Sequence, residues 1–191
     1  MFKEETIAIL KEKLQKKNVA SRGQAGRTFS YIESHHAIRE ANRAFGFDGW
    51  NYTVDQLNPV CEPYENHNGN SIVSYIAIVT IDVNGTTRQD TGFGQGISKD
   101  VGQAHESASK EAVSDAMKRA LRTFGDIFGL ALYDKDQANV TTMGPEAMAD
   151  AIMLINACES KNEMQEYYLT LSQDAKADLL DEFKRKRQEF K

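Results

Sequence analysis

The stretch Val73-Ser-Tyr-Ile-Ala-Ile-Val-Thr-Ile-Asp-Val83 decides the fold, because it is the strongest strand signal in the chain. Six apolar side chains recur at every second position along it, at 73, 75, 77, 79, 81 and 83. A period of two places these side chains on one face of a strand. The pair Asn84-Gly85 follows directly and is typical of the two-residue type I′ turn of a hairpin.

Two further strands are expected beside this one. Residues 86 to 93 return after the turn, and residues 50 to 54 precede it with apolar side chains at positions 50, 52 and 54. The sequence therefore predicts an antiparallel meander with one covered face. The stretch Gly92-Phe-Gly-Gln-Gly96 is expected to end the sheet as a flexible connection, since it lacks the Lys-Ser or Lys-Thr of a phosphate loop.

A long helix is predicted from residue 101 to residue 124, ended by Gly125. Alanine recurs every four residues along it, at positions 104, 108, 112, 116 and 120. Residues four apart share one helix face, and small side chains there let a second element approach closely. The expected fold class is therefore α+β, with the antiparallel β-meander packed on this long α-helix.

The rest of the chain is expected to form helices and loops. A short helix is predicted over residues 3–17, a polar loop over 21–27, and a second helix over 34–45 with Gly46 as its C-cap. A break at residues 137–145 precedes a stretch whose pattern is helical throughout. We therefore expect a core at residues 1–138 and a small all-helical C-terminal module at residues 139–191.

Composition narrows the class of protein. The chain has 191 residues, of which 40% are apolar and 27% charged, which is typical of a globular protein. The sequence lacks the run of about 18 apolar residues that would predict a membrane helix. Its first residues do not resemble a secretory signal, so a cytoplasmic protein is expected. Cys61 and Cys158 lie far apart in the sequence and indicate reduced thiols rather than a disulfide or metal site.

The net charge of −5 is unevenly distributed. Residues 1–43 carry nine Lys and Arg against five Asp and Glu, whereas residues 44–98 carry one against six. Binding of an anion depends on the local field rather than on the total charge. A nucleic-acid partner is therefore compatible with this acidic chain.

The last turns of the long predicted helix carry a cluster of cations. Lys118 and Arg122 lie four residues apart and share a face, with Arg119 beside them, and Lys110 extends the row. Such a row can hold the phosphates of a nucleic acid without reading its bases. The alternative is that nearby carboxylates, those of Glu111, Asp115 and Asp126, neutralise the row in ion pairs.

Motifs of a catalytic site are missing from the sequence. The adjacent His35 and His36 point to different sides of their helix, and no His-x-x-x-His, Cys-x-x-Cys or Gly-x-Ser-x-Gly pattern occurs. The acidic turn Asp134-Lys-Asp136 is a common surface feature. We therefore expect a binding protein without a cofactor rather than an enzyme, and keep as one alternative a metal-dependent nuclease that uses Glu111, Asp115 and Asp134.

Two long motifs resemble the signatures of the Rad52 single-strand annealing family. The first runs from Tyr31-Ile-Glu-Ser-His35 through Ala41-Asn42 to Phe45-Gly-Phe-Asp-Gly-Trp50. The second is Lys110-Glu-Ala-Val-Ser-Asp-Ala-Met-Lys-Arg-Ala-Leu-Arg-Thr-Phe-Gly125. Their order and spacing also agree with the family over about residues 20 to 138, and the chain length suggests a phage or bacterial member.

The resemblance implies a function and a set of site residues. Members assemble into a large ring that holds single-stranded DNA in an outer basic groove, without ATP, and leave the bases free to pair. The groove residues carry over to Lys118, Arg119 and Arg122. His36 and Phe47 also fall at DNA-binding positions of the groove, although the family frequently has arginine at the first and tyrosine at the second. Lys99 falls at a second DNA site.

The expected function is thus an ATP-independent single-stranded DNA-binding and strand-annealing mediator of recombination or double-strand break repair. The expected partners are single-stranded DNA, further copies of the chain and a single-strand-binding protein. A DNA-end protector of the same fold, without annealing activity, is a second alternative. The aromatic side chains of Trp50, Tyr52, Tyr75 and Phe93 are expected in the core rather than against bases, because they alternate along strands.

Overall fold

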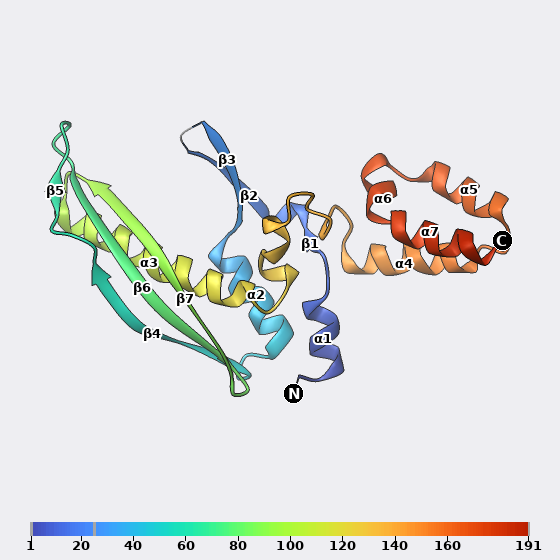
Figure 1. Cartoon of the computed structure of the whole chain (residues 1–191), viewed down its shortest axis with the longest axis horizontal. Coiled ribbons are helices and arrows are strands. Elements are labelled where there is room, and N and C mark those ends of the chain that lie inside the picture. Colours follow the sequence, from blue (N-terminus) through green and yellow to red (C-terminus); the bar gives the residue numbers. More distant parts are fainter. Residues whose placement is uncertain (1, 25, 191) are drawn as a thin grey trace.

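The computed structural model describes residues 2–24 and 26–190, and it shows an antiparallel sheet packed on a long helix, with several helices after them (Figure 1). In chain order its helices and strands are α1 (Glu4–Leu10), β1 (Leu14–Gln15), β2 (Val19–Gln24), β3 (Arg27–Ile32), α2 (Ser34–Phe45), β4 (Trp50–Pro59), β5 (Tyr64–Glu65), β6 (Ser71–Val83), β7 (Thr86–Ser98), α3 (Val101–Arg122), β8 (Val140–Thr141), α4 (Pro145–Ala157), α5 (Lys161–Thr170), α6 (Gln173–Asp178) and α7 (Leu180–Glu189). Short 3₁₀ segments lie between some of them: η1 (Lys16–Asn18), η2 (Asp126–Phe128) and η3 (Leu130–Tyr133).

The sheet is organised around β6, which contains the alternating stretch that predicted it. Strand β6 pairs antiparallel with β4 on one side and with β7 on the other, and β5 pairs with its first residues. The turn between β6 and β7 has positive φ at Asn84 (50°) and Gly85 (80°), as a type I′ turn requires. The predicted meander and its turn are therefore confirmed.

The glycine stretch lies inside strand β7 instead of ending the sheet, so the prediction of a flexible connection is wrong. Gly92, Gly94 and Gly96 all face α3. A Cβ atom built on Gly94 would lie 2.1 Å from the carbonyl oxygen of Ala108, and one built on Gly96 would lie 1.9 Å from that of Ala104. The helix backbone therefore rests directly on the strand, and the alanine face of α3 is what permits this approach.

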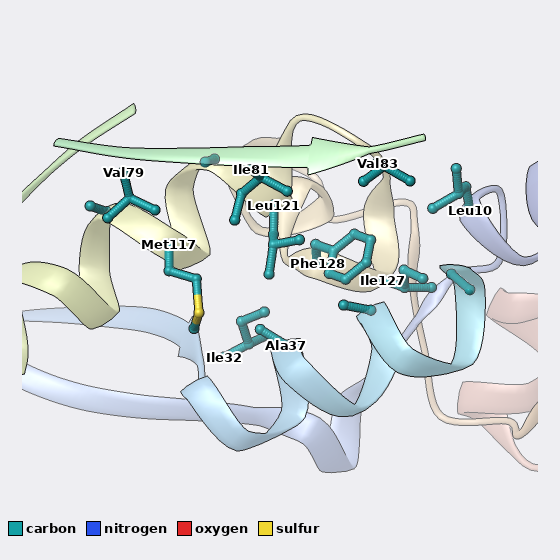
Figure 2. Close-up of a cluster of buried hydrophobic side chains, with 14 of the residues drawn as sticks. Leu10, Ile32, Ala37, Val79, Ile81, Val83, Met117, Leu121, Ile127 and Phe128 are labelled. Carbon is teal, nitrogen blue, oxygen red and sulfur yellow. The ribbon is translucent and has the colours of Figure 1, made fainter. Parts of the chain in front are cut away.

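An apolar cluster fills the space between the sheet, α3 and α2 (Figure 2). Val79 and Ile81 of β6 point from the sheet toward Met117 and Leu121 of α3. Phe128 of η2 is also fully buried in this cluster. The predicted 34–45 helix forms over the expected residues, and its face with Ala37 closes the cluster on the side away from the sheet.

The N-terminal predictions were partly wrong because tertiary pairing overrides the local pattern. Helix α1 ends at Leu10 rather than near residue 17, and Leu14 is buried where β1 pairs in parallel with β8. The predicted loop over 21–27 forms the hairpin of β2 and β3, with residue 25 outside the described part of the chain.

Two aromatic side chains expected in the core are half-exposed: Tyr52 of β4 (48%) and Phe93 of β7 (50%). Helix α3 covers only part of the sheet's inner face, which leaves Tyr52 open, and Phe93 lies on the outer face because Gly92 and Gly94 on either side of it face the helix. Alternation along a strand therefore predicted which side chains share a face of the sheet. It did not predict which parts of that face a helix would cover.

The C-terminal helices α4, α5, α6 and α7 lie at the opposite end of the molecule from the sheet (Figure 1). They share a buried cluster of their own, which includes Ile155, Met164, Leu179 and Phe183. The stretch that was predicted to be helical throughout forms these helices. Among the described residues, none of the helices combines the length and the apolar character needed to cross a membrane.

His36 on α2 is buried against η2. Its ring atom Nε2 lies 3.3 Å from the carbonyl oxygen of Ile127, so the tautomer with a proton on Nε2 donates a hydrogen bond there. Burial lowers the pKa of His36 below its ordinary value of 6.5, although the nearby Glu40 carboxylate opposes the shift. The folded protein therefore holds this histidine in its neutral form at neutral pH.

Replacement of Gly94 by alanine tests the close packing of β7 on α3. We expect Gly94→Ala to lower the free energy of unfolding by about 1–3 kcal/mol or more, because the new methyl group overlaps helix backbone that cannot move aside. Urea denaturation followed by circular dichroism measures this change. Gly23→Ala in β2 is the matched control, since no atom lies within 4 Å of the position that its new methyl group would take. Equal stability of the two variants would contradict the packing described above.

The burial of His36 predicts a pH dependence of stability. Because the pKa is lower in the folded state, the unfolded chain takes up the proton first as the pH falls, so the free energy of unfolding should decrease below about pH 6.5. His36→Gln keeps a donor for the Ile127 carbonyl but does not titrate. Its stability should change less than that of the wild type between about pH 7.5 and 5.5 in thermal melts, and identical pH profiles would rule out this role of His36.

Candidate nucleic-acid interface

The three cations predicted at the end of α3 project from one side of the helix, and each is held by a different set of contacts. Lys118 donates from Nζ to the carbonyl oxygen of Ile32 (3.4 Å), and its Nζ lies 5.7 Å from the ring centroid of Tyr31. Arg119 donates from Nε to Oδ1 of Asp90 (3.1 Å). These contacts tie the cations to strands β3 and β7.

Arg122 completes the row and is the more buried of the two arginines, with 17% of its side chain exposed against 39% for Arg119. Its guanidinium group lies 3.8 Å from Oδ2 of Asp90 and stacks at 4.1 Å over the ring of Tyr133 in η3. Cation–π contacts of this kind restrain a guanidinium group while they leave its charge intact. The row is therefore positioned before any ligand arrives.

A shallow groove opens beside these cations, and we call it the cationic groove. Lys118, Arg119 and Arg122 line it together with Tyr31, Tyr133 and Asp115. Its walls come from β3 and η3, and the last turns of α3 form one side. Segments of the chain about a hundred residues apart thus meet at one surface.

The carboxylates that the alternative interpretation pairs with the row do not contact it. Glu111 accepts the backbone N–H of Gln95 (3.0 Å) and lies 3.7 Å from Arg22, and Asp115 accepts the N–H of Phe93 (3.4 Å). Asp126 instead accepts a hydrogen bond from the Asn139 side chain.

Asp90 takes the place of those three carboxylates. It is shared by Arg119 and Arg122, whereas Lys118 has no ion pair among the described residues. Three cations against Asp90 and the lining Asp115 leave a net charge of +1 in the groove. An arginine that is partly exposed and shares its carboxylate gains little from that pair, so the row can exchange it for a phosphate.

The other predicted site residues lie away from the cationic groove. Lys110 sits two turns earlier on α3, is exposed, and forms an ion pair with Glu106. Lys99 is exposed in the turn between β7 and α3, at the opposite end of that helix. Phe47 is 88% exposed in the turn after α2, on a surface shared with His35 and Arg39.

His36 does not join them, because it is buried against Ile127 and its lowered pKa keeps it uncharged at neutral pH. The expectation that it contacts a ligand in the groove is not supported by this placement. His36 lies on the inward face of α2 and packs in the core. An arginine at this position would need a carboxylate partner, or its charged group would have to reach solvent.

Sequence reasoning missed four residues that shape the groove: Arg22, Tyr31, Asp90 and Tyr133. Two cations lie near the centroid of the Tyr31 ring, the guanidinium carbon of Arg22 at 5.9 Å and Nζ of Lys118 at 5.7 Å. One clue to Asp90 was available in the sequence, since it lies two residues before Gly92 on the same strand. Because side chains alternate along a strand, both positions face inward. Nothing local indicates Tyr133, which reaches Arg122 only through the fold of η2 and η3.

Comparison with known proteins shows which family the chain resembles. Residues 3–147 match the model of the Rad52/22 family of double-strand break repair proteins. The chain is 39% identical over 149 residues to the DNA repair and recombination protein mus-11 of Neurospora crassa, which covers 73% of this chain and 25% of that protein. It is 36% identical over 115 residues to rad22 of Schizosaccharomyces pombe, which covers 59% of this chain and 24% of that protein.

A third relative is the DNA repair and recombination protein RAD52 of Saccharomyces cerevisiae, 38% identical over 109 residues, which are 56% of this chain and 23% of that protein. The chain thus spans about a quarter of the length of these relatives. All three are fungal, so they give no support to the expected phage or bacterial origin. The match over most of its length shows that the chain belongs to the Rad52/22 family of DNA repair and recombination proteins.

Proposed function

We propose that the chain binds single-stranded DNA by its phosphates in the cationic groove, without ATP, and promotes the annealing of complementary strands. In this role it is a mediator of homologous recombination or double-strand break repair. The observation that carries the proposal is the row of Lys118, Arg119 and Arg122, preorganised by Tyr31 and Tyr133 and countered by one shared carboxylate.

The chemistry of the groove fits a polynucleotide backbone better than a base. Guanidinium groups bind phosphate oxygens through paired N–H donors, and a lysine adds a point charge. Contacts to phosphates position a strand but leave its base edges free. A strand held in this way can present its bases to a second strand, which is the requirement for annealing.

Self-association into a ring belongs to the same proposal. Tyr52, Val54 and Leu57 of β4 pair with Ile81, Val79 and Ala77 of β6 and therefore share the inner face of the sheet. Their partners are buried, whereas these three side chains are 38–48% exposed, because α3 covers β6 and β7 rather than β4. An open apolar strip on an edge strand supports contact with another copy of the chain.

The two alternative functions make different demands on the groove. An end protector needs the same phosphate contacts but does not accelerate pairing. A nuclease needs Glu111, Asp115 and Asp134 together at one metal, but the first two accept backbone N–H groups of β7 and Asp134 accepts those of Asp136 and Ala138. In the described residues no three acidic, histidine or cysteine side chains gather as metal ligands.

Charge reversal in the groove tests the proposal. We expect Lys118→Glu to weaken binding of a labelled oligo(dT), followed by fluorescence anisotropy, by at least about tenfold, because the new carboxylate repels phosphate. The melting temperature should fall only slightly, since Lys118 loses one long hydrogen bond to the Ile32 carbonyl (3.4 Å) and no ion pair with a described residue. Lys135→Glu, an equal charge change in an exposed turn, is the control and should bind as the wild type does.

An annealing assay with complementary oligonucleotides and no nucleotide cofactor completes this test. The wild type should accelerate duplex formation, and Lys118→Glu should not. Binding without acceleration favours the end protector, and cleavage of the oligonucleotides with magnesium favours the nuclease. Unchanged DNA affinity in Lys118→Glu would refute the groove assignment itself.

A further inference from the structure

A second groove lies in the C-terminal helices, beyond residues 3–147 that match the family model. It is formed by α5 and α7, and we call it the α5–α7 groove. Its floor is apolar: Met164 and Phe183 are buried, and the Tyr168 ring stands perpendicular to that of Phe183 at 5.0 Å. Leu180 at its edge is 45% exposed. The floor therefore offers apolar surface to a large side chain from outside.

Cations surround this floor. The charged residues that line the groove are Lys161, Lys184 and Arg187, and no carboxylate from residues 2–24 or 26–190 lines it. Lys184 forms an ion pair with Asp181 (3.1 Å), whereas Lys161 and Arg187 have no ion pair within the described part of the chain. The neighbouring cations of α7 are paired, Arg185 with Glu182 and Lys186 with Glu189.

The groove is positively charged, whereas the segment that forms it is acidic overall. Residues 139–191 hold ten Asp and Glu against seven Lys and Arg, a net charge of −3. An exposed helix face in an acidic segment is expected to carry both signs, as the rest of α7 does. The groove instead combines a surplus of cations with an open apolar floor, and the two features together specify the chemistry of a ligand.

We propose that the α5–α7 groove binds an acidic peptide segment of a partner protein that carries a large apolar side chain. The apolar side chain packs on Phe183, Tyr168 and Leu180, and the carboxylates of the peptide approach Lys161 and Arg187. A nucleic acid fits less well, because its flat bases stack on open aromatic faces, whereas the Tyr168 and Phe183 rings of this floor pack edge to face against each other. Complementary charge of this kind orients a peptide and accelerates its association.

The experiment uses the full chain and a fluorescein-labelled peptide of consecutive aspartates that ends in Leu-Phe, with binding measured by anisotropy. We expect the double variant Lys161→Ala/Arg187→Ala to weaken binding by roughly tenfold. The control Lys135→Ala should leave the affinity unchanged. A peptide with alanine in place of its phenylalanine should also bind several-fold more weakly, because it cannot fill the floor.

Several outcomes would overturn the proposal. One is the absence of peptide binding. Another is an affinity that stays the same when the phenylalanine of the peptide is replaced, which would indicate charge attraction alone. A double variant that loses affinity for oligo(dT) while it still binds the peptide would assign the groove to DNA. A change in its particle mass would assign the groove to a second copy of the chain. None of these outcomes depends on the cationic groove, because the variants leave Lys118, Arg119 and Arg122 unchanged.

Discussion

The direct contact between the backbone of β7 and the alanine face of α3 determines where everything else in the core lies. Gly92, Gly94 and Gly96 leave no side chain between the strand and the helix, and any Cβ atom there would overlap helix backbone. This contact fixes how α3 is rotated about its own axis. At about 100° per residue, the alanine face meets the strand, Met117 and Leu121 turn toward the core, and the remaining arc presents Lys118, Arg119 and Arg122.

The cations are therefore a consequence of helix packing, and their surroundings decide how they are held. Two tyrosines from distant segments lie against Lys118 and Arg122, and Asp90 bridges the two arginines. Asp90 lies on the strand that α3 packs against, so the packing that orients the helix also supplies the carboxylate that orients its arginines. One carboxylate cannot neutralise three cations, which leaves the row available to an anion.

Much of the core was predictable because its signals are periodic. The two-residue alternation of β6, the Asn84-Gly85 turn and the four-residue alanine repeat of α3 each predicted an element that forms. The glycines of β7 were misread because a small residue in sequence is equally compatible with a flexible link and with a close contact. Only the partner helix distinguishes the two, and the alanine repeat was the available clue.

The site was predictable only where its residues belong to one helix. Lys118, Arg119 and Arg122 share a face of α3 that spacing alone defines, and the structure brings them to one groove. His36 could not be placed in this way, because whether a helix residue faces the core or solvent depends on what packs on it. Tyr133 enters the site through long-range contacts that no local pattern encodes. The alternation of β7 places Asp90 on the inner face, but it does not show that Arg119 and Arg122 share this carboxylate.

The salt dependence of DNA binding tests most directly whether this row holds phosphates. The logarithm of the affinity for oligo(dT) should fall linearly with the logarithm of the salt concentration, with a slope of about −0.7 for each phosphate neutralised. Replacement of Lys118, Arg119 and Arg122 by glutamine should reduce the magnitude of that slope by about 2, because roughly three phosphate contacts are lost. An unchanged slope in the triple variant would contradict the account, since the cations that meet the DNA would then lie elsewhere.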